Sequence, residues 1–478
     1  MTAADLCSAW LRSARILGLL LLPLLAGCQI QDLRPQAKAP ALPAAYQGKN
    51  AAIQASGIAQ VSWWQALRDP MLERLMAQSL AQNLTLVQAQ QRLTAARALA
   101  HSSIAAYSPN VGLNALAQGG TAKATRDDPT RRPLQVNLDG GWEVSLFGQK
   151  GLTRIAADAS AGMAAQDVEA AKLAVMADVA SAYTRLRARQ QRRMINEALI
   201  GLLGKNQVLE QTKAKTGLQA PVQADLYRME MEAAKLERSQ LEASIADTLQ
   251  QIATLLGTAS TDPGLAAPAT QPVVGKTAIA ARPADLLRQR PDVRRAELVV
   301  LQSGAEVGLA EADLYPKIQL SGMIGIGTAV AGSVFSAMGG SSIQLPLFDQ
   351  GKRRDIVTAR KAQLEEAMAA YRQNVLSAYE EASAALRAWQ LAKQNTARLT
   401  ADLKAADAKR NAANLLLRQG LADASGSLGA QIAVLRLRGE LVDSVESESL
   451  AFVLFSKAIG GSPAGGLAVA SGRQDAGR

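Results

Sequence analysis

Residues suited to redox or metal chemistry are almost absent from this chain. Its 478 residues include two cysteines, Cys7 and Cys28, and one histidine, His101. Because both cysteines lie near the N-terminus, the rest of the chain can form neither a disulfide nor a cysteine-based zinc site. His101 has no second histidine to complete a site, so we assign it a structural role. We expect no metal and no cofactor.

Two further features that the sequence lacks narrow the classes of function that it can have. Aromatic residues make up only 4% of the chain, which suits long, closely packed helices better than a bulky globular core. No nucleophile and base pair is recognisable, and Gly201–Lys205 lacks the spacing of a phosphate loop, so we do not expect an enzyme. The formal charge of +11 is spread along helices among acidic residues, without an aromatic-interleaved basic patch, which argues against nucleic-acid binding.

The N-terminal residues have the pattern of a secretory signal. Arg12 and Arg15 precede an apolar run, Ile16–Leu25, that is too short to span a bilayer. Leu25-Ala26-Gly27-Cys28 then resembles a bacterial lipobox. The resemblance implies a signal peptide over 1–27, lipidation of Cys28, and outer-membrane sorting because Gln29 rather than Asp follows. Residues 28–60 have no periodicity and are predicted to be a lipidated tether.

Alternation of polar and apolar residues predicts four strands, over 109–118, 134–147, 317–327 and 341–348. In the second of these, the even positions are apolar and the odd positions are mostly polar. Small residues over 328–340 predict a loop between the last two strands. The polar face would line a watery lumen if the strands lie in a membrane; its candidate lining residues are Gln135, Asn137, Asp139, Glu143 and Ser145.

Very long helices follow the strands. No proline occurs between Gly151 and Lys215, and a helix of this length would extend about 100 Å. Val175, Val179, Ala182 and Leu186 have the 4-3-4 spacing of a coiled-coil seam. Breaks near Gly217 and Gly420 predict two helical hairpins, the first returning over 222–256 and the second ending near 459.

Landmarks recur at nearly constant offsets, which indicates an internal duplication. Pro109 and Pro316 are 207 residues apart, Phe147 and Phe348 are 201 apart, and the two tip glycines are 203 apart. We divide the chain into a first repeat (61–257), a linker (258–281), a second repeat (282–460) and a disordered tail (461–478).

Four strands make too small a sheet to close, and open strand edges are not tolerated in lipid. The strands therefore need other copies of the chain. The pattern predicts a homo-oligomeric barrel in an outer membrane, with the helices extending into the periplasm.

A family resemblance supports this interpretation. Residues 282–297 match the pattern P-x-x-L-L-x-x-R-P-D-I/V-x-x-A-E of TolC-like outer membrane efflux lipoproteins of the OprM/NodT type, and Ala312–Ile318 matches their strand entry. The signature residues are Arg290, Pro291, Asp292, Ala296 and Glu297. Because Pro and Asp suit the first turn of a helix, we assign Arg290 to Asp292 a helix-start role rather than a catalytic one.

The resemblance implies a mostly α-helical trimer in which four strands per chain form a shared twelve-stranded β-barrel, continued by a coiled-coil helical barrel. It implies a passive exit duct for small molecules, lipid-anchored in the outer membrane. The implied partners are outer membrane lipid, a periplasmic adaptor and an inner-membrane transporter of the RND type. The residues implied to contact the adaptor are the hairpin tips Thr216, Gly217, Leu218, Gln419, Gly420 and Leu421.

The chain departs from the family at the periplasmic gate. Members close this end with acidic residues six and nine positions after the second tip glycine, where this chain has Gly426 and Gly429. Asp225 and Asp423 lie close to the tips and are our gate candidates, although each could simply be a solvated charge at a helix end.

Two other functions stay open at this point. One is the duct of a type I protein secretion system, which shares the architecture. The other is a coiled-coil structural lipoprotein without a pore, against which the alternating strands argue. The transported substrate is not encoded in any recognisable motif.

Overall fold

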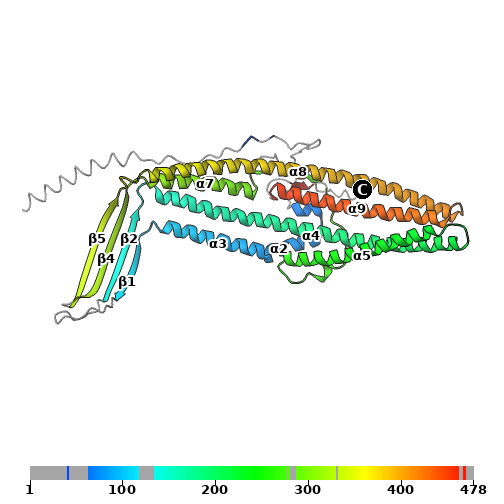
Figure 1. Ribbon diagram of the computed structural model, residues 1–478, viewed down its shortest axis with the longest axis horizontal. Helices are drawn as coiled ribbons and strands as arrows, with labels where there is room; N and C mark the ends of the chain where they lie inside the picture. The colour runs from blue at the N-terminus through cyan, green and yellow to red at the C-terminus, as the bar shows by residue number, and fades with distance from the viewer. Residues whose placement is uncertain are drawn as a thin grey trace, which may run out of the picture. The chain divides into compact units, whose positions relative to one another are not determined.

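The computed structural model describes residues 40, 41, 43, 63–117, 134–275, 277–279, 287–329, 332–461 and 467–469. The predicted signal peptide, Cys28, most of the tether and nearly all of the tail lie outside the described residues, as do 282–286 of the family signature. Helices dominate the described part, and a small antiparallel sheet accompanies them (Figure 1). Among the described residues, no helix combines the length and apolar character needed to cross a membrane.

The elements follow one another in the same order in each half. A helix, two strands and a helical hairpin occur twice, and the first helices of the two hairpins both have 67 residues. The elements are η1 (Trp63–Leu67), α2 (Pro70–Gln82), α3 (Leu84–Ala105), β1 (Asn110–Ala117), β2 (Leu134–Val144), α4 (Gln149–Lys215), α5 (Val222–Leu255), η2 (Pro263–Leu265), β3 (Thr277–Ile279), α7 (Pro291–Ala312), β4 (Lys317–Ala329), β5 (Gly332–Gln344), α8 (Lys352–Arg418), α9 (Ala424–Ala458) and β6 (Leu467–Val469).

The chain forms two compact units. Among the described residues, one unit comprises 93–117, 134–164, 295–329 and 332–371 and includes the four-stranded sheet; the other comprises 63–92, 165–275, 287–294 and 372–461 and includes both hairpin tips. Long helices contribute to both, because α4 and α8 each contain residues of the two units.

In the first unit the strands lie in the order β1-β2-β4-β5, all antiparallel, so β1 and β5 are the edges (Figure 1). Leu113 lies opposite Leu138, and Leu138 lies opposite Ile324, so the apolar positions of successive strands share one face. Most of this face is exposed, while Val144 and Ile318 are half-buried. Its large members are Val111, Leu113, Val136, Leu138, Trp142, Leu320, Ile324, Ile326, Phe335 and Ile343.

The predicted bounds of the last strand are wrong. β5 covers Gly332–Gln344, so most of the expected loop over 328–340 is strand. Its Gly, Ser and Ala residues lack an apolar alternation, but each pairs with a residue of β4, and this pairing decides the conformation. The strand ends at Gln344 because its partner β4 begins there, at Lys317.

Two helix boundaries also differ from the expected ones. The helix expected from Met71 to Ala105 is interrupted at Asn83, whose backbone is extended. The Asn83 carboxamide oxygen accepts from the amides of Thr85 and Leu86, and its amide group donates to the Leu255 carbonyl at 2.7 Å. The helix expected over 282–303 is α7, which begins at Pro291, because the residue before a proline disfavours the helical region.

The core of the second unit follows the predicted coiled-coil seam. Val179, Ala182 and Leu186 of α4 are completely buried. Trp389 of α8 stacks on Phe455 of α9, with ring centroids 5.7 Å apart. The long helices thus bury their apolar seams against neighbouring helices.

A matched pair of glycines provides a test of this packing. Gly217 and Gly257 both have a positive φ, of 73° and 72°. A methyl group at Gly217 would meet open space, whereas at Gly257 it would lie 2.5 Å from the Gln82 carbonyl oxygen.

We predict that Gly217→Ala lowers the free energy of unfolding by about 1 kcal/mol. Gly257→Ala should lower it by about 3 kcal/mol, because steric overlap with the backbone adds to the conformational cost. Urea titration of the detergent-solubilised protein, followed by far-ultraviolet circular dichroism, measures both. Equal effects of the two variants would contradict this packing.

Candidate functional site at the hairpin tips

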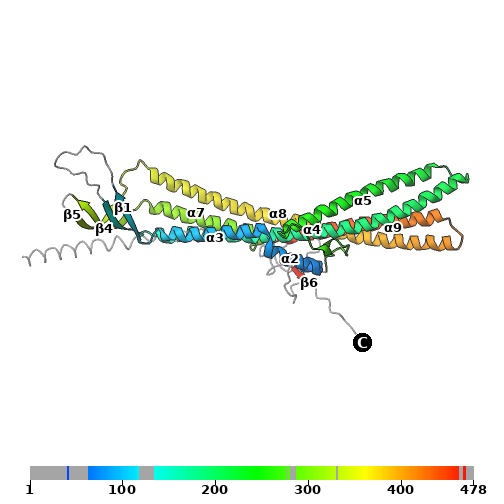
Figure 2. The ribbon, with the colours of Figure 1, turned by 90° about the horizontal axis from the view of Figure 1, so that it is seen from below.

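Both hairpins reverse direction through the same backbone motif. The Leu218 amide donates to the Lys213 carbonyl at 2.9 Å, and the Leu421 amide donates to the Leu416 carbonyl at the same distance. Gly217 and Gly420 adopt the left-handed conformation that this helix ending requires. The two tips lie at the same end of the second unit (Figure 1, Figure 2). The six residues predicted at the tips, which include Thr216 and Gln419, are all exposed.

A polar cluster connects the end of α4 to the beginning of α9. The Lys213 ammonium group lies 2.9 Å from the Asp423 carboxylate, 2.9 Å from the Ser425 hydroxyl and 3.1 Å from the Glu210 carboxylate. The Ser425 hydroxyl donates to the same Glu210 oxygen at 2.6 Å. Glu210 is buried, whereas Asp423 is exposed. We call Glu210, Lys213, Asp423 and Ser425 the tip cluster; it joins the two hairpins of one chain.

The ion pair in the tip cluster shifts the pKa values of both its members. The hydrogen bond from Lys213 lowers the pKa of Asp423, and the same contact raises the pKa of Lys213. The Asp423 contribution is present above the ordinary carboxyl pKa of about 3.9 and is lost as the pH falls through the lowered value. The Lys213 contribution is lost only as the pH rises through a value above about 10.4. The pair therefore persists across the neutral range.

The structure separates the two gate candidates. Asp423 belongs to the tip cluster and also caps α9, where it accepts from the Gly426 amide at 3.0 Å. Asp225 lies in the first turn of α5, and its salt bridge is a local one to Arg228 at 3.2 Å. Thus only Asp423 connects one hairpin with the other.

Sequence reasoning missed Glu210, Lys213 and Ser425. A signal was present only at Glu210, which lies four heptads after Ala182 and places a carboxylate at a seam position where an apolar side chain is expected. Asn206 and Glu210 are buried.

Four of the five residues predicted to line a lumen lie on one face of β2. Gln135, Asn137, Asp139 and Glu143 alternate with the apolar face of β2, and Asp139 accepts a hydrogen bond from Asn114 on β1. Ser145 is the exception, because β2 ends at Val144. Its hydroxyl donates to Gln149 and accepts from the Lys150 amide at 3.0 Å, so it caps α4 instead.

The signature arginine ties three helices together. Arg290, directly before α7, donates to Asp292, to Glu381 of α8 at 2.7 Å, and to the Ala458 carbonyl at the end of α9. Burial opposes ionisation of Asp292, but the Arg290 guanidinium outweighs it and lowers the pKa of that carboxyl. The start of α7 at Pro291 confirms the helix-start role. Ala296 and Glu297 follow within α7.

His101 is exposed on α3. Within the described part of the chain, no three residues of the His, Cys, Asp and Glu types gather closely enough to hold a metal ion.

Comparison with known proteins identifies the family. A family profile described as "Outer membrane efflux protein" matches two segments, residues 75–258 and 283–461. The chain belongs to the outer membrane efflux protein family. Nodulation protein T of Rhizobium leguminosarum bv. trifolii is 28% identical over 91% of this chain and 95% of its own. The toluene efflux pump outer membrane protein TtgF of Pseudomonas putida is 26% identical over 69% of this chain and 70% of its own.

A solved structure agrees with this assignment. The outer-membrane channel OprN aligns with a TM-score of 0.75 and 28% identity, covering 89% of this chain and 99% of that channel. This member of the efflux family is accordingly a TolC-like outer membrane channel that serves as an efflux exit duct.

Substitution of Arg290 tests whether its contacts with α7, α8 and α9 stabilise the fold. We expect Arg290→Met to lower the free energy of unfolding by about 2 kcal/mol, because it leaves the Ala458 carbonyl and two carboxylates without their donor. Arg294→Met is the matched control, since Arg294 is exposed on the same helix. Urea unfolding of both variants compares them; an equal loss in the control would show that the Arg290 contacts contribute nothing specific.

From the tip cluster we predict that Asp423, rather than Asp225, restrains opening of the channel. Removing the ion pair and the cap with Asp423→Ala, about 1 kcal/mol together, should raise the open-state population and the mean conductance in planar bilayers about fivefold. Asp423→Asn keeps a capping side chain and should have a smaller effect. Asp225→Ala is the control and should leave conductance unchanged. If it raises conductance as much as Asp423→Ala does, the tip cluster is not the restraint.

Proposed function

We propose that this efflux-family protein works as a homotrimer, the exit duct of a tripartite pump that conducts small molecules passively from the periplasmic side to the exterior. The observation that carries the proposal is the sheet, which exposes a continuous apolar face and leaves two edge strands. An exposed apolar face of this extent suits contact with lipid. Edge strands in lipid must pair, and identical chains supply the complementary edges.

Three copies would place twelve strands in one closed barrel. The family profile's two separate matches, and the repeated order of helix, strands and hairpin, support the internal duplication that gives such a barrel a nearly regular wall. The polar face with Gln135, Asn137, Asp139 and Glu143 would then line the lumen. Glycine at 325 leaves room for the Asn137 side chain, which a methyl group there would meet at very short range.

The hairpins supply the periplasmic part of the duct. Their exposed tips, with Leu218 and Leu421 more than 70% exposed, are proposed to contact a periplasmic adaptor. An inner-membrane transporter, of the RND type in this proposal, would select and energise the substrate. The duct itself would need no cofactor and perform no catalysis, and a lipid on Cys28 would anchor it in the outer membrane.

Complementation tests the duct. The full chain is expressed, with an RND transporter and its adaptor, in a host that lacks its own outer membrane channels. We expect dye accumulation to fall only when all three proteins are present, because the duct completes the path. An outer-membrane trimer that restores no dye efflux with several transporter pairs, but restores export of a secreted protein with a type I transporter, would overturn the small-molecule assignment.

The docking surface is tested within the same assay. Gly420→Trp places a large side chain at a tip where a Cβ would meet open space, so the fold bears only the cost of a left-handed backbone, about 1 kcal/mol, while the adaptor contact is blocked. We expect loss of efflux with a normal amount of trimer. Leu391→Trp, on an exposed position of α8 away from the tip, is the control. Normal efflux by Gly420→Trp would exclude the second tip from docking.

A further inference from the structure

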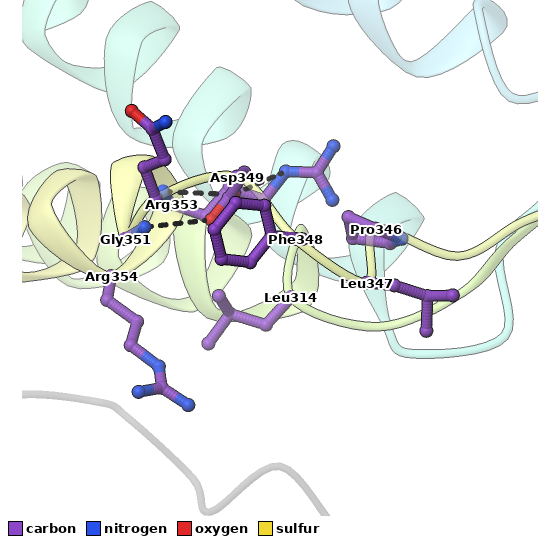
Figure 3. A pocket seen from close by; sticks show the side chains of 9 residues that line it. Leu314, Pro346, Leu347, Phe348, Asp349, Gly351, Arg353 and Arg354 are labelled. Atoms are coloured by element: carbon purple, nitrogen blue, oxygen red, sulfur yellow. Dashed lines mark hydrogen bonds and ion pairs between the residues drawn. The ribbon is translucent and has the colours of Figure 1, made fainter.

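The first unit has a pocket of about 430 Å³ where β5 leads into α8, between Leu314 and the segment Pro346–Arg354 (Figure 3). The Asp349 carboxylate there accepts from two backbone amides, and the Arg353 guanidinium lies 3.7 Å from it. The Arg354 side chain also lines the pocket. Because its carboxylate is engaged and two guanidinium groups stand at its wall, this pocket is a poor site for a cation.

The polar face of the sheet offers the opposite chemistry, halfway along its strands. Asp139 of β2 lies opposite Met323 of β4, and Met323 lies opposite Met338 of β5. Asp139 is the sixth of the eleven residues of β2, and each methionine is the seventh of thirteen in its strand. We call these three residues the methionine row. It brings one carboxylate and two thioethers together in the middle of the sheet.

The sheet uses methionine in this row and nowhere else. Within their described bounds, β1, β2, β4 and β5 contain only Met323 and Met338. The large side chains of the apolar face are instead those of leucine, isoleucine, valine, phenylalanine and tryptophan. Met338 is 69% exposed and lies on a face whose other central residues are polar or small, so packing in a core does not explain it.

The side chains of the methionine row can reach a common point. Directly opposite residues of an antiparallel pair have Cβ atoms about 4.5–5.5 Å apart, and methionine adds three rotatable bonds. The neighbours of each methionine on the same face of its own strand, two residues away, are small: Ser321 and Gly325 on β4, and Ser336 and Gly340 on β5. Both sulfur atoms and an Asp139 oxygen can therefore approach one ion.

The donor atoms of the row select a particular class of ion. Thioether sulfur is a soft ligand that binds soft ions such as Cu⁺ in preference to Mg²⁺ or Ca²⁺. Leucine has similar bulk but no donor atom, so contact with an apolar solute would not require methionine. The Asp139 carboxylate adds the negative charge that attracts a cation. Without thiolate or imidazole ligands the row would hold such an ion weakly, as conduction through a channel requires.

We propose that the methionine row binds soft monovalent cations of the Cu⁺ and Ag⁺ class as they pass through the lumen, and that such ions are substrates of this duct. The inference rests on the proposed function, because the polar face lines a lumen only when the sheet is part of a closed barrel. Three copies would place three such rows at one level of that barrel. The ion is cargo, and the row implies no resident metal.

Silver binding tests the row directly. Silver nitrate is titrated into the full chain in detergent and chloride-free buffer, and calorimetry measures the affinity. M323L/M338L keeps the bulk of both side chains and should lower the affinity at least about tenfold, since even outer-shell changes at metal sites cost this much. Asp139→Asn should also weaken binding, because the carboxylate charge is lost. Every variant keeps its cysteines and its histidine, so these contribute equally to each titration.

Two control variants show whether the effect belongs to the row. M194L/M229L removes two exposed methionines, one on α4 and one on α5. Glu143→Gln removes a carboxylate from the same face of β2, where it lies opposite Gln319 instead of a methionine. Neither control should change the silver affinity. An unchanged affinity in M323L/M338L, or an equal loss in a control, would overturn the proposal.

Transport is measured in the host without its own outer membrane channels, with a silver-exporting RND transporter and its adaptor. We expect the full chain to restore growth on silver nitrate, and M323L/M338L to lose this tolerance while efflux of an uncharged dye through a drug transporter persists. Normal silver tolerance of M323L/M338L with normal dye efflux overturns the cargo role and leaves the duct standing. Loss of dye and silver export together in M323L/M338L overturns the selectivity for soft ions. No dye efflux by the unmodified chain overturns the duct and, with it, the cargo role.

Discussion

The constraint on which the architecture depends is the pairing of backbone groups in strands that carry an apolar outer face. The sheet has only four strands, and each of its edge strands, β1 and β5, has a neighbour on one side only among the described residues. The exposed face, with Leu113, Leu138 and Ile324 in one row, excludes water as the environment that satisfies these edges. The proposed oligomerisation of this efflux protein would in this sense be a requirement of its hydrogen bonds rather than an addition to a finished fold.

The long helices face a different problem, because a helix of 67 residues can be stable only if its seam is covered along its length. α4 solves it in two ways. Val179, Ala182 and Leu186 are apolar and completely buried, as in a permanent core. Nearer the tip, Glu210 is buried and contacts Lys213 and Ser425, although Leu203 still packs in an apolar cluster with Ala234 and Ile432. Separating polar side chains that water can solvate costs less than exposing an apolar core, so the tip cluster costs less to separate than the seam around Leu186.

Sequence reasoning predicted the helices well and the contacts poorly. α4 ends at Lys215 as expected, because the left-handed glycine motif and the absence of proline are local signals. Failures occurred where a distant partner decides. Asn83 breaks a helix by bonding to Leu255, and β5 extends through small residues because β4 pairs with them. Ser145 was assigned to the polar strand face on alternation alone, yet it caps α4. The tip cluster joins residues more than 200 positions apart, and no local pattern encodes that contact.

The position of that cluster changes how closure of the periplasmic end is to be understood. Gly426 and Gly429 stand where related channels carry acidic residues, and the Gly426 amide instead supports Asp423. If the tip cluster is the gate, as we predict, its charges lie between the two hairpins of one chain rather than facing like charges of other copies. Attraction within a chain holds the hairpins together without any bound cation, whereas a ring of carboxylates repels itself. A partner that docks at the tips can shift the equilibrium only by binding the separated hairpins more tightly than the joined ones. Since Asp423 is exposed, such a partner can reach it directly, and a basic group that competes with Lys213 would supply that difference in affinity.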